Sequence, residues 1–206
     1  MAVESVIGAT INLTLMSADS MHRSWHDPRF AEVTKQRFAG WLADSKRGRA
    51  RFAAAAVDHL QLTPKFLNVG SPITDMLAWD SQNWQLFCRH VGLYWHGKTV
   101  ATLIDKKSVA ALSEAVGEEF YRDCLIRKDL WVAAQKRGPV QKLIKLLVRD
   151  GESCIFAWTK ALNADVAEVV RLRLPRTTHT EIAQQHAPLA KSIVAHVAQL
   201  RLEAKS

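Results

Sequence analysis

Residues 79–131 read WDSQNWQLFCRHVGLYWHGKTVATLIDKKSVAALSEAVGEEFYRDCLIRKDLW and contain the densest apolar periodicity of the chain. Apolar residues recur at steps of three or four, which places them on one face of a helix. The first such series is Trp84, Phe87, Cys88, Val91, Tyr94 and Trp95. Ser81 or Asn83 can cap the start of this helix, and Gly97 is expected to end it as a left-handed C-terminal residue.

Two more helices are predicted before residue 131. After a short helical turn at Val100–Ile104, Asp105 or Ser108 can cap a helix that Gly117 ends. Its apolar residues are Val109, Leu112 and Val116. Glu118 and Glu119 open the next helix, where acidic side chains suit the positive end of the helix dipole. Its apolar face is Phe120, Tyr121, Cys124 and Leu125. Such short breaks require the three helices to pack on one another.

The flanking segments extend this helical pattern. Alternating apolar residues at 11–15 indicate a short extended segment, and helices are expected after Pro28 and over residues 52–60. A helix beginning at Pro139 is expected to end at Asp150-Gly151, with a separate short element over residues 153–162. An amphipathic helix is predicted over residues 165–174, and a capping box at residues 178–181 precedes a final helix that kinks or restarts at Pro188.

The pattern as a whole predicts an all-α, compact globular bundle of about eight to ten helices with a short extended N-terminal segment. We expect a single helical domain over residues 1–206, with a possible subdivision into 1–78 and 79–206.

Composition limits the function less than the fold. The chain has 206 residues, 28 of them basic and 20 acidic, for a net charge of +8. This surplus allows nucleic acid, an anionic membrane surface or an acidic protein as partner. Cys88, Cys124 and Cys154 are expected to be buried thiols in a reducing compartment. The N-terminus makes a poor secretion signal, and no apolar run approaches the roughly 20 residues of a membrane span, so a cytoplasmic location is expected.

One motif suggests nucleotide binding. Gly92, Gly97, Lys98 and Thr99 fit the phosphate-loop pattern G-x-x-x-x-G-K-[ST]. The four intervening residues include Tyr94 and Trp95, whose bulk suits a helix face better than a tight anion nest. We therefore interpret the match as a decoy inside helical sequence and expect no cofactor. A P-loop nucleotide hydrolase stays open as the alternative.

The remaining candidates favour a binding protein over an enzyme. His22 and His26 have a spacing that could ligate a metal, but no third ligand is evident, and we expect neither a metal site nor a catalytic centre. Basic clusters occur at Lys46–Arg51, at Lys136-Arg137 and over Arg171–Arg176. They favour solvated faces or a surface for an acidic protein, and a basic helical DNA-binding regulator is a further alternative.

A resemblance is carried by Gly92-Leu-x-x-His96-Gly97-x-x-Val100, Leu103-Ile104-Asp105 and Leu112-x-x-x-Val116-Gly117-Glu118-x-x-Tyr121. This pattern resembles the SctK (YscK-like) family, cytoplasmic accessory proteins of bacterial type III secretion systems. The resemblance covers about residues 79–130, a quarter of the chain, and contains no catalytic signature.

The resemblance implies a non-enzymatic adaptor of the sorting platform. Such an adaptor links the cytoplasmic domain of the inner-membrane ring protein to the spoke protein, above the export ATPase. It would bind no nucleic acid and would reach the inner membrane only through protein partners. For this role we expect partner binding at Arg47, Arg49, Arg51 and Trp131.

Overall fold

The computed structural model describes residues 9–12, 66–69, 73–77, 79–133, 138–175 and 182–204. These residues form eight α-helices and one two-stranded antiparallel ribbon, which confirms the predicted all-α fold with a short extended segment near the N-terminus. The helices expected after Pro28 and over residues 52–60, the capping box at 178–181, and Arg47, Arg49 and Arg51 lie outside the described residues.

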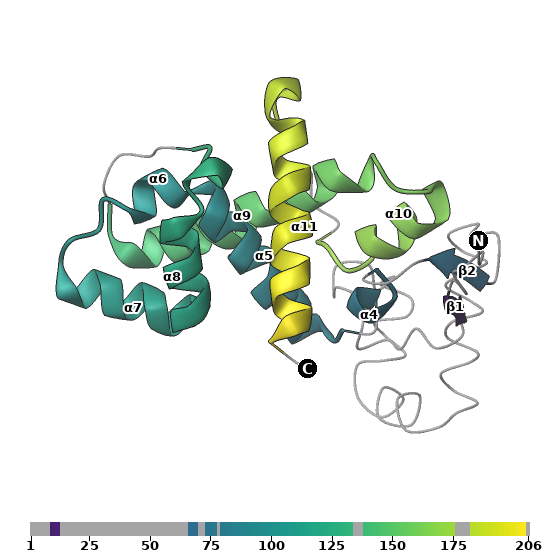
Figure 1. The fold of residues 1–206 in the computed structure, drawn as a ribbon, viewed down its shortest axis with the longest axis horizontal. Helices are drawn as coiled ribbons and strands as arrows, with labels where there is room; N and C mark the ends of the chain where they lie inside the picture. The colour runs from purple at the N-terminus through teal and green to yellow at the C-terminus, as the bar shows by residue number, and fades with distance from the viewer. Residues whose placement is uncertain are drawn as a thin grey trace, which may run out of the picture. The chain divides into compact units, whose positions relative to one another are not determined.

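Figure 1 shows the elements in chain order. The strands are Ala9–Asn12 (β1) and Phe66–Val69 (β2). The α-helices are Ile73–Leu77 (α4), Ser81–Trp95 (α5), Gly97–Val100 (α6), Lys106–Val116 (α7), Glu118–Ile126 (α8), Val140–Thr159 (α9), Ala164–Arg171 (α10) and Ala187–Glu203 (α11). Two 3₁₀ turns are Lys128–Leu130 (η4) and Gln184–His186 (η5).

The chain divides into two compact units. The first comprises Met1–Ser81 and Leu162–Thr177, and the second comprises Gln82–Ala161 and Thr178–Ser206. In the first unit, β1 pairs with β2 so that Ala9 lies opposite Val69 and Asn12 opposite Phe66. The buried guanidinium of Arg173 donates to the carbonyl oxygen of Leu77 at 2.8 Å and so joins the segment after α10 to the end of α4. Burial lowers the pKa of Arg173 to about 10.

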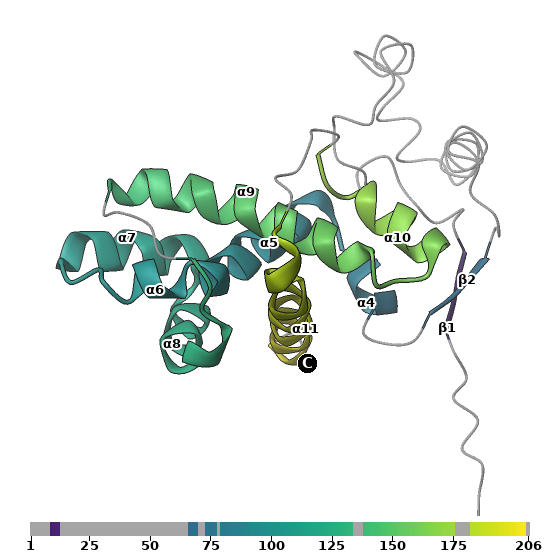
Figure 2. The same ribbon diagram turned by 90° about the horizontal axis from the view of Figure 1, so that it is seen from above.

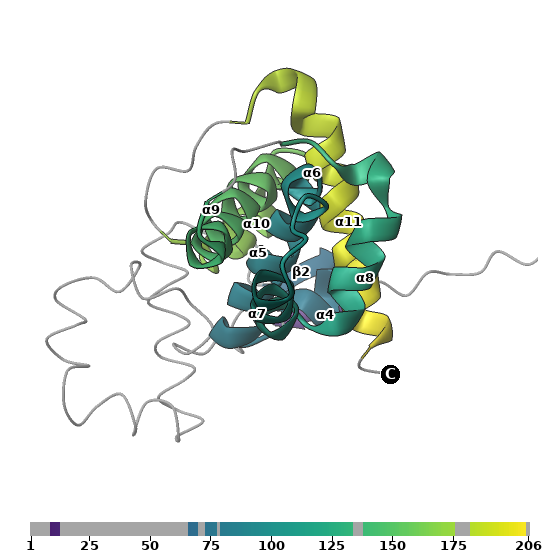
Figure 3. The ribbon, with the colours of Figure 1, turned by 90° about the vertical axis from the view of Figure 1, so that its left-hand side faces the viewer.

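Helix α5 is the centre of the second unit. Helix α9 lies on one side of it, and α8 and α11 lie on the other side (Figures 2 and 3). Helix α11 crosses α9 steeply, because Figure 1 shows it upright and Figure 2 shows it end-on. The central position of α5 explains why most of its apolar series is buried, with Phe87, Val91 and Tyr94 each 0% exposed.

Helices α5 and α9 approach each other through two glycines. A Cβ atom at Gly92 would lie 1.8 Å from the carbonyl oxygen of Leu147, and a Cβ atom at Gly151 would lie 1.8 Å from that of Cys88. The contact is reciprocal, because each glycine faces the backbone four residues before the other glycine. No side chain fits in this crossing, so glycine is required on both helices.

This crossing corrects the predicted helix boundary at Asp150-Gly151. Helix α9 continues through Gly151 to Thr159, and the element expected over residues 153–162 is its second half. Glycine is a weak helix former and often ends a helix, which is why the sequence favoured a break. Here the close contact with α5 decides the role of Gly151, and the helix pattern on either side is continuous.

Gly97 also differs from its predicted role. It is the first residue of α6, and among the described glycines only Gly117 has a positive φ, at 85°. A Cβ atom at Gly97 would lie 1.9 Å from Cδ1 of Trp131. Gly97 is therefore required by the indole that covers it and not by a left-handed backbone.

The α7–α8 junction follows the prediction closely. The Asp105 carboxylate accepts a hydrogen bond from the backbone N–H of Ser108 at 2.7 Å and caps α7. Gly117 ends α7 and directly precedes α8, which opens with Glu118 and Glu119. The three cysteines are buried free thiols, and burial raises the pKa of Cys124 to about 12. No helix among the described residues has the length and apolar character needed to cross a membrane.

The glycine crossing makes a clear prediction about stability. Gly→Ala in a helix interior normally stabilises by roughly 0.5–1 kcal/mol. At Gly92 or Gly151 we expect the opposite sign, a loss of about 2 kcal/mol or more, because the new methyl group collides with backbone that cannot move independently. Urea denaturation of Gly92→Ala and Gly151→Ala measures the change.

Gly138→Ala is the matched control, because a Cβ atom at Gly138 meets nothing within 4 Å. Its stability is expected to stay within about 0.5 kcal/mol of the parent. A Gly92→Ala protein as stable as the parent would contradict the close-packed crossing.

Candidate docking groove

The phosphate-loop match lies on helical backbone. Gly92 is inside α5, and Gly97, Lys98 and Thr99 belong to α6. The backbone N–H groups of Thr99 and Val100 both donate to the carbonyl of His96, at 2.8 and 3.0 Å. A phosphate nest needs such N–H groups to be free and to converge on the anion. The helical interpretation of this stretch is therefore confirmed, and its geometry differs from that of a phosphate loop.

Trp131, which we predict to bind a partner, makes a structural contact within the fold. Its indole packs on Gly97, and its Nε1–H donates to the carbonyl of Cys124 at 2.8 Å. The side chain is half-buried. Partner binding by Trp131 stays a prediction, as does binding by Arg47, Arg49 and Arg51.

A buried histidine–carboxylate pair joins α9 to the α5–α6 junction. His96 is 0% exposed, and its Nε2–H donates to Oδ2 of Asp150 at 2.8 Å. The guanidinium of Arg149 donates to Oδ1 of the same carboxylate at 2.7 Å. Burial favours the neutral acid, but these two hydrogen bonds outweigh it and hold the pKa of Asp150 below its usual range.

A second polar cluster joins α5, α8 and α11. Tyr94 Oη and His196 Nε2 donate to Oδ2 of Asp123 at 2.5 and 2.8 Å, and Nδ1 of His196 accepts from Arg127 at 3.0 Å. Burial would raise the pKa of Asp123, but the hydrogen bonds from Tyr94 and His196 lower it. The carboxylate is thus held ionised between two donors.

A third cluster ties α11 to α5 and to the end of α7. His90 donates through Nε2 to the carbonyl of Val116 at 2.7 Å, and its Nδ1 accepts from Arg201 at 3.2 Å. Its ring stacks on Phe120, with centroids 3.7 Å apart. Burial and the nearby charge of Arg201 lower the pKa of His90 to about 3. Each of the three clusters links helices through hydrogen bonds, and no group of three metal-binding side chains occurs in the described part of the chain.

A concave feature among the described residues of the second unit is a groove where the C-terminal end of α9 faces η5 and the start of α11. It has a volume of about 880 Å³. Its lining is mainly apolar: Phe156, Ala157, Trp158, Ala161, Ile182, Ala183, Ala187 and Pro188. Ser153 and Gln184 add polar groups, and Lys160 and Lys191 are the charged residues that line it.

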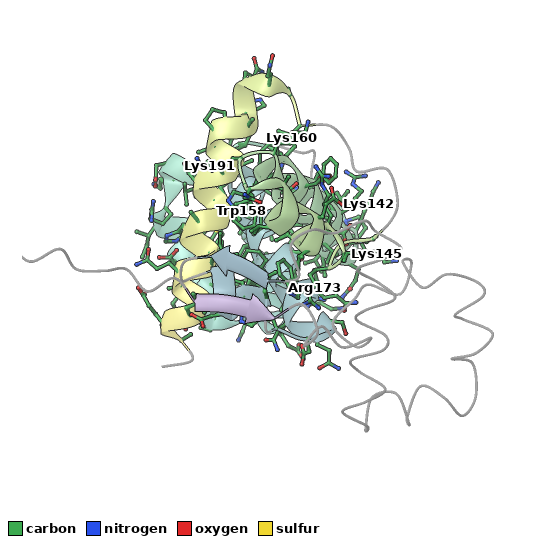
Figure 4. The ribbon with its side chains drawn as sticks, turned by 90° about the vertical axis from the view of Figure 1, so that its right-hand side faces the viewer. Lys142, Lys145, Trp158, Lys160, Arg173 and Lys191 are labelled. Atoms are coloured by element: carbon green, nitrogen blue, oxygen red, sulfur yellow. The ribbon has the colours of Figure 1, made fainter. Side chains whose placement is uncertain are left out.

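The two lysines give the groove a positive rim. Both are exposed, and Figure 4 shows them near each other, with Trp158 below. No described residue forms an ion pair with Lys191. Apolar walls with a cationic rim can bury an apolar side chain while pairing with carboxylates beside it. The groove is therefore suited to an acidic protein segment.

Little in the sequence indicated this groove. Residues 153–162 were expected to form a separate element, so nothing placed the end of α9 beside Pro188 and Lys191. The lysines are single charges outside the basic clusters. A usable signal was present in the uninterrupted helical spacing of Leu143, Leu147, Cys154 and Trp158, which are all buried on α9.

No protein-family model, curated protein or solved structure matches the chain, so its function is argued from its own residues.

We predict that the phosphate-loop match binds no nucleotide. Titration of the full chain with Mg-ATP is expected to show no saturable binding, because the N–H groups of residues 99 and 100 are already paired within the helix. Lys98→Ala is expected to behave identically, since Lys98 is exposed on α6. Saturable binding that the Lys98→Ala substitution abolishes would overturn this view.

We predict that Glu152 makes the stability of the fold depend on pH in a specific way. Burial raises the pKa of this half-buried carboxyl group on α9 to about 7. A raised pKa stabilises the fold at low pH, and this contribution is lost as the pH rises through about 7. Glu152→Gln removes the titrating group, so the stability of the variant relative to the parent should increase between pH 5 and pH 8.

Melting temperatures across this pH range measure the effect. Glu114→Gln, at an exposed glutamate of α7, is the control and should leave the pH profile of the parent unchanged. A constant difference between Glu152→Gln and the parent at every pH would show that Glu152 titrates as an ordinary surface carboxylate.

Proposed function

We propose that this chain is a non-enzymatic helical adaptor that binds other proteins through the groove between α9 and α11. The groove carries the proposal, because it combines apolar walls with Lys160 and Lys191 at the rim. The polar clusters, in contrast, hold the helices of the unit together. A rigid helical body with an exposed charged groove is suited to joining two partners.

The specific role we propose is that of an adaptor in a type III secretion sorting platform. It would act in the cytoplasm and connect the cytoplasmic domain of the inner-membrane ring protein to the spoke protein. The resemblance of residues 92–121 to the SctK family supports this role. Several residues of that pattern have architectural tasks here: Gly92 in the helix crossing, His96 in a buried pair, Gly97 under Trp131 and Gly117 between α7 and α8.

Because these residues have structural roles, the members of a family can share such a pattern although it contains no catalytic site. Each residue fixes the distance or direction between two helices, and none requires a substrate. The P-loop hydrolase and the DNA-binding regulator have no comparable support, because the loop geometry differs and the groove is lined mainly by apolar atoms.

The proposal predicts saturable binding to the spoke protein or to the ring protein's cytoplasmic domain from the genome that encodes this chain. Isothermal titration with the purified proteins measures it. Lys160→Glu combined with Lys191→Glu should weaken binding about ten-fold or more, because both charges at the groove are reversed.

Lys106→Glu combined with Lys107→Glu is the matched control, with the same charge change at exposed positions of α7. A third variant, Arg47→Glu with Arg49→Glu and Arg51→Glu, tests the cluster expected from the sequence. If the folded parent binds neither protein, the secretion role is wrong. If the Lys160/Lys191 variant binds like the parent, the groove is not the docking site.

A further inference from the structure

One face of α9 continues the charge of the groove along the helix. At about 100° per residue, Lys142, Lys145, Arg149, Phe156 and Lys160 fall within about 60° of one another. The four cationic side chains are exposed and Phe156 is half-buried. Figure 4 shows Lys142 beside Lys145, and Lys160 closer to Lys191 on α11. We call this set the α9 basic stripe.

Two lysines of the stripe, Lys142 and Lys145, have charges that are available to a partner. Lys142 and Lys145 form no ion pair with any residue that the structure describes, whereas Arg149 pairs with Asp150. Asp150 itself is directed toward His96. Glu152 is the one remaining acidic residue between Val140 and Lys160, a range that the structure describes completely. The stripe therefore presents positive charge along most of α9.

The groove favours a helical occupant over an extended one. Its walls are side chains of α9, η5 and α11, and the described part of this unit contains no strand edge to pair with a peptide backbone. An extended segment would place its N–H and C=O groups against apolar walls without partners. A helix satisfies these groups internally and presents only side chains.

We propose that the α9 basic stripe and the groove together bind an acidic amphipathic helix of a partner protein. Its apolar side chains enter the groove beside Phe156, and its carboxylates pair with Lys142, Lys145, Lys160 and Lys191. This inference rests on the proposed adaptor function and specifies the chemistry of the docked segment. From residue 142 to residue 160 the stripe is about 27 Å long, which about five turns of partner helix cover.

Nucleic acid fits these observations less well. Phosphate backbones need closely spaced cations and gain nothing from an apolar groove. Here the cations are spread along one helix, and the concave part is lined mainly by alanine, proline and aromatic side chains.

The test uses the full chain and a fluorescent synthetic peptide of about 20 residues, designed as an amphipathic helix with glutamates on one face and leucines on the other. A scrambled peptide of the same composition is the first control, and poly-L-glutamate and duplex DNA are the others. Fluorescence anisotropy measures binding to the peptides, and competition measures binding to the other two. We expect the amphipathic peptide to bind about ten-fold or more tightly than the scrambled one.

Two variants locate the site. Lys145→Glu combined with Lys160→Glu should weaken peptide binding about ten-fold, since it reverses two charges of the stripe. Ala161→Trp should weaken it similarly by filling the groove, because Ala161 is an exposed lining residue. Lys106→Glu combined with Lys107→Glu should bind like the parent. Circular dichroism confirms that each variant is folded.

Equal binding of the scrambled peptide or of poly-L-glutamate would overturn the inference, because charge alone would then suffice. Tighter, strongly salt-dependent binding of duplex DNA would overturn it in favour of nucleic acid. If the chain binds the spoke or ring protein but not the amphipathic peptide, the inference is wrong while the adaptor function stands. If it binds none of them, both are wrong.

Discussion

The close crossing of α5 and α9 is the constraint on which the second unit depends. Gly92 and Gly151 each lie against the backbone of the opposite helix, so the separation of the helices is set by main-chain atoms. Main-chain contact leaves little tolerance for sliding or rotation. Helix α9 lies on one side of α5, α8 and α11 lie on the other side, and Trp84, Phe87 and Tyr94 of α5 are buried.

The same crossing produces the groove. Because Gly151 lies inside α9, the helix carries its pattern on to Thr159 and places Phe156, Ala157 and Lys160 opposite the start of α11. Pro188 contributes from the other wall. It lies in the first turn of α11, where a missing N–H is harmless and the restricted φ suits a helix start. A helix that ended at Asp150 would provide no wall, so the continuation of α9 through Gly151 provides both the packing against α5 and one wall of the groove.

Local signals were sufficient for much of this fold, and long-range contacts account for the errors. Asp105 and Gly117 act through neighbours within four residues, and the sequence indicated both correctly. Gly97 and Gly151 looked like helix ends because glycine favours that role, but each is required by a partner distant in the sequence, Trp131 and Cys88 respectively. His96 and Asp150 are 54 residues apart, and no spacing rule relates them. The groove was missed for the same reason, since its two walls come from separate helices.

The buried polar groups have a structural role, which distinguishes them from the exposed lysines at the groove. Oδ2 of Asp123 already accepts hydrogen bonds from Tyr94 and His196, and both oxygens of Asp150 are engaged by His96 and Arg149. A general base needs a lone pair directed at a substrate, whereas these carboxylates are held ionised by donor side chains of the protein itself. His90, with a pKa lowered to about 3, stays neutral and acts as a fixed link between helices. The lysines around the groove have the opposite character, because they are exposed and lie beside apolar surface. The partner binding that we propose is assigned to that surface, and the buried polar clusters tie each of its helical walls to other helices of the unit.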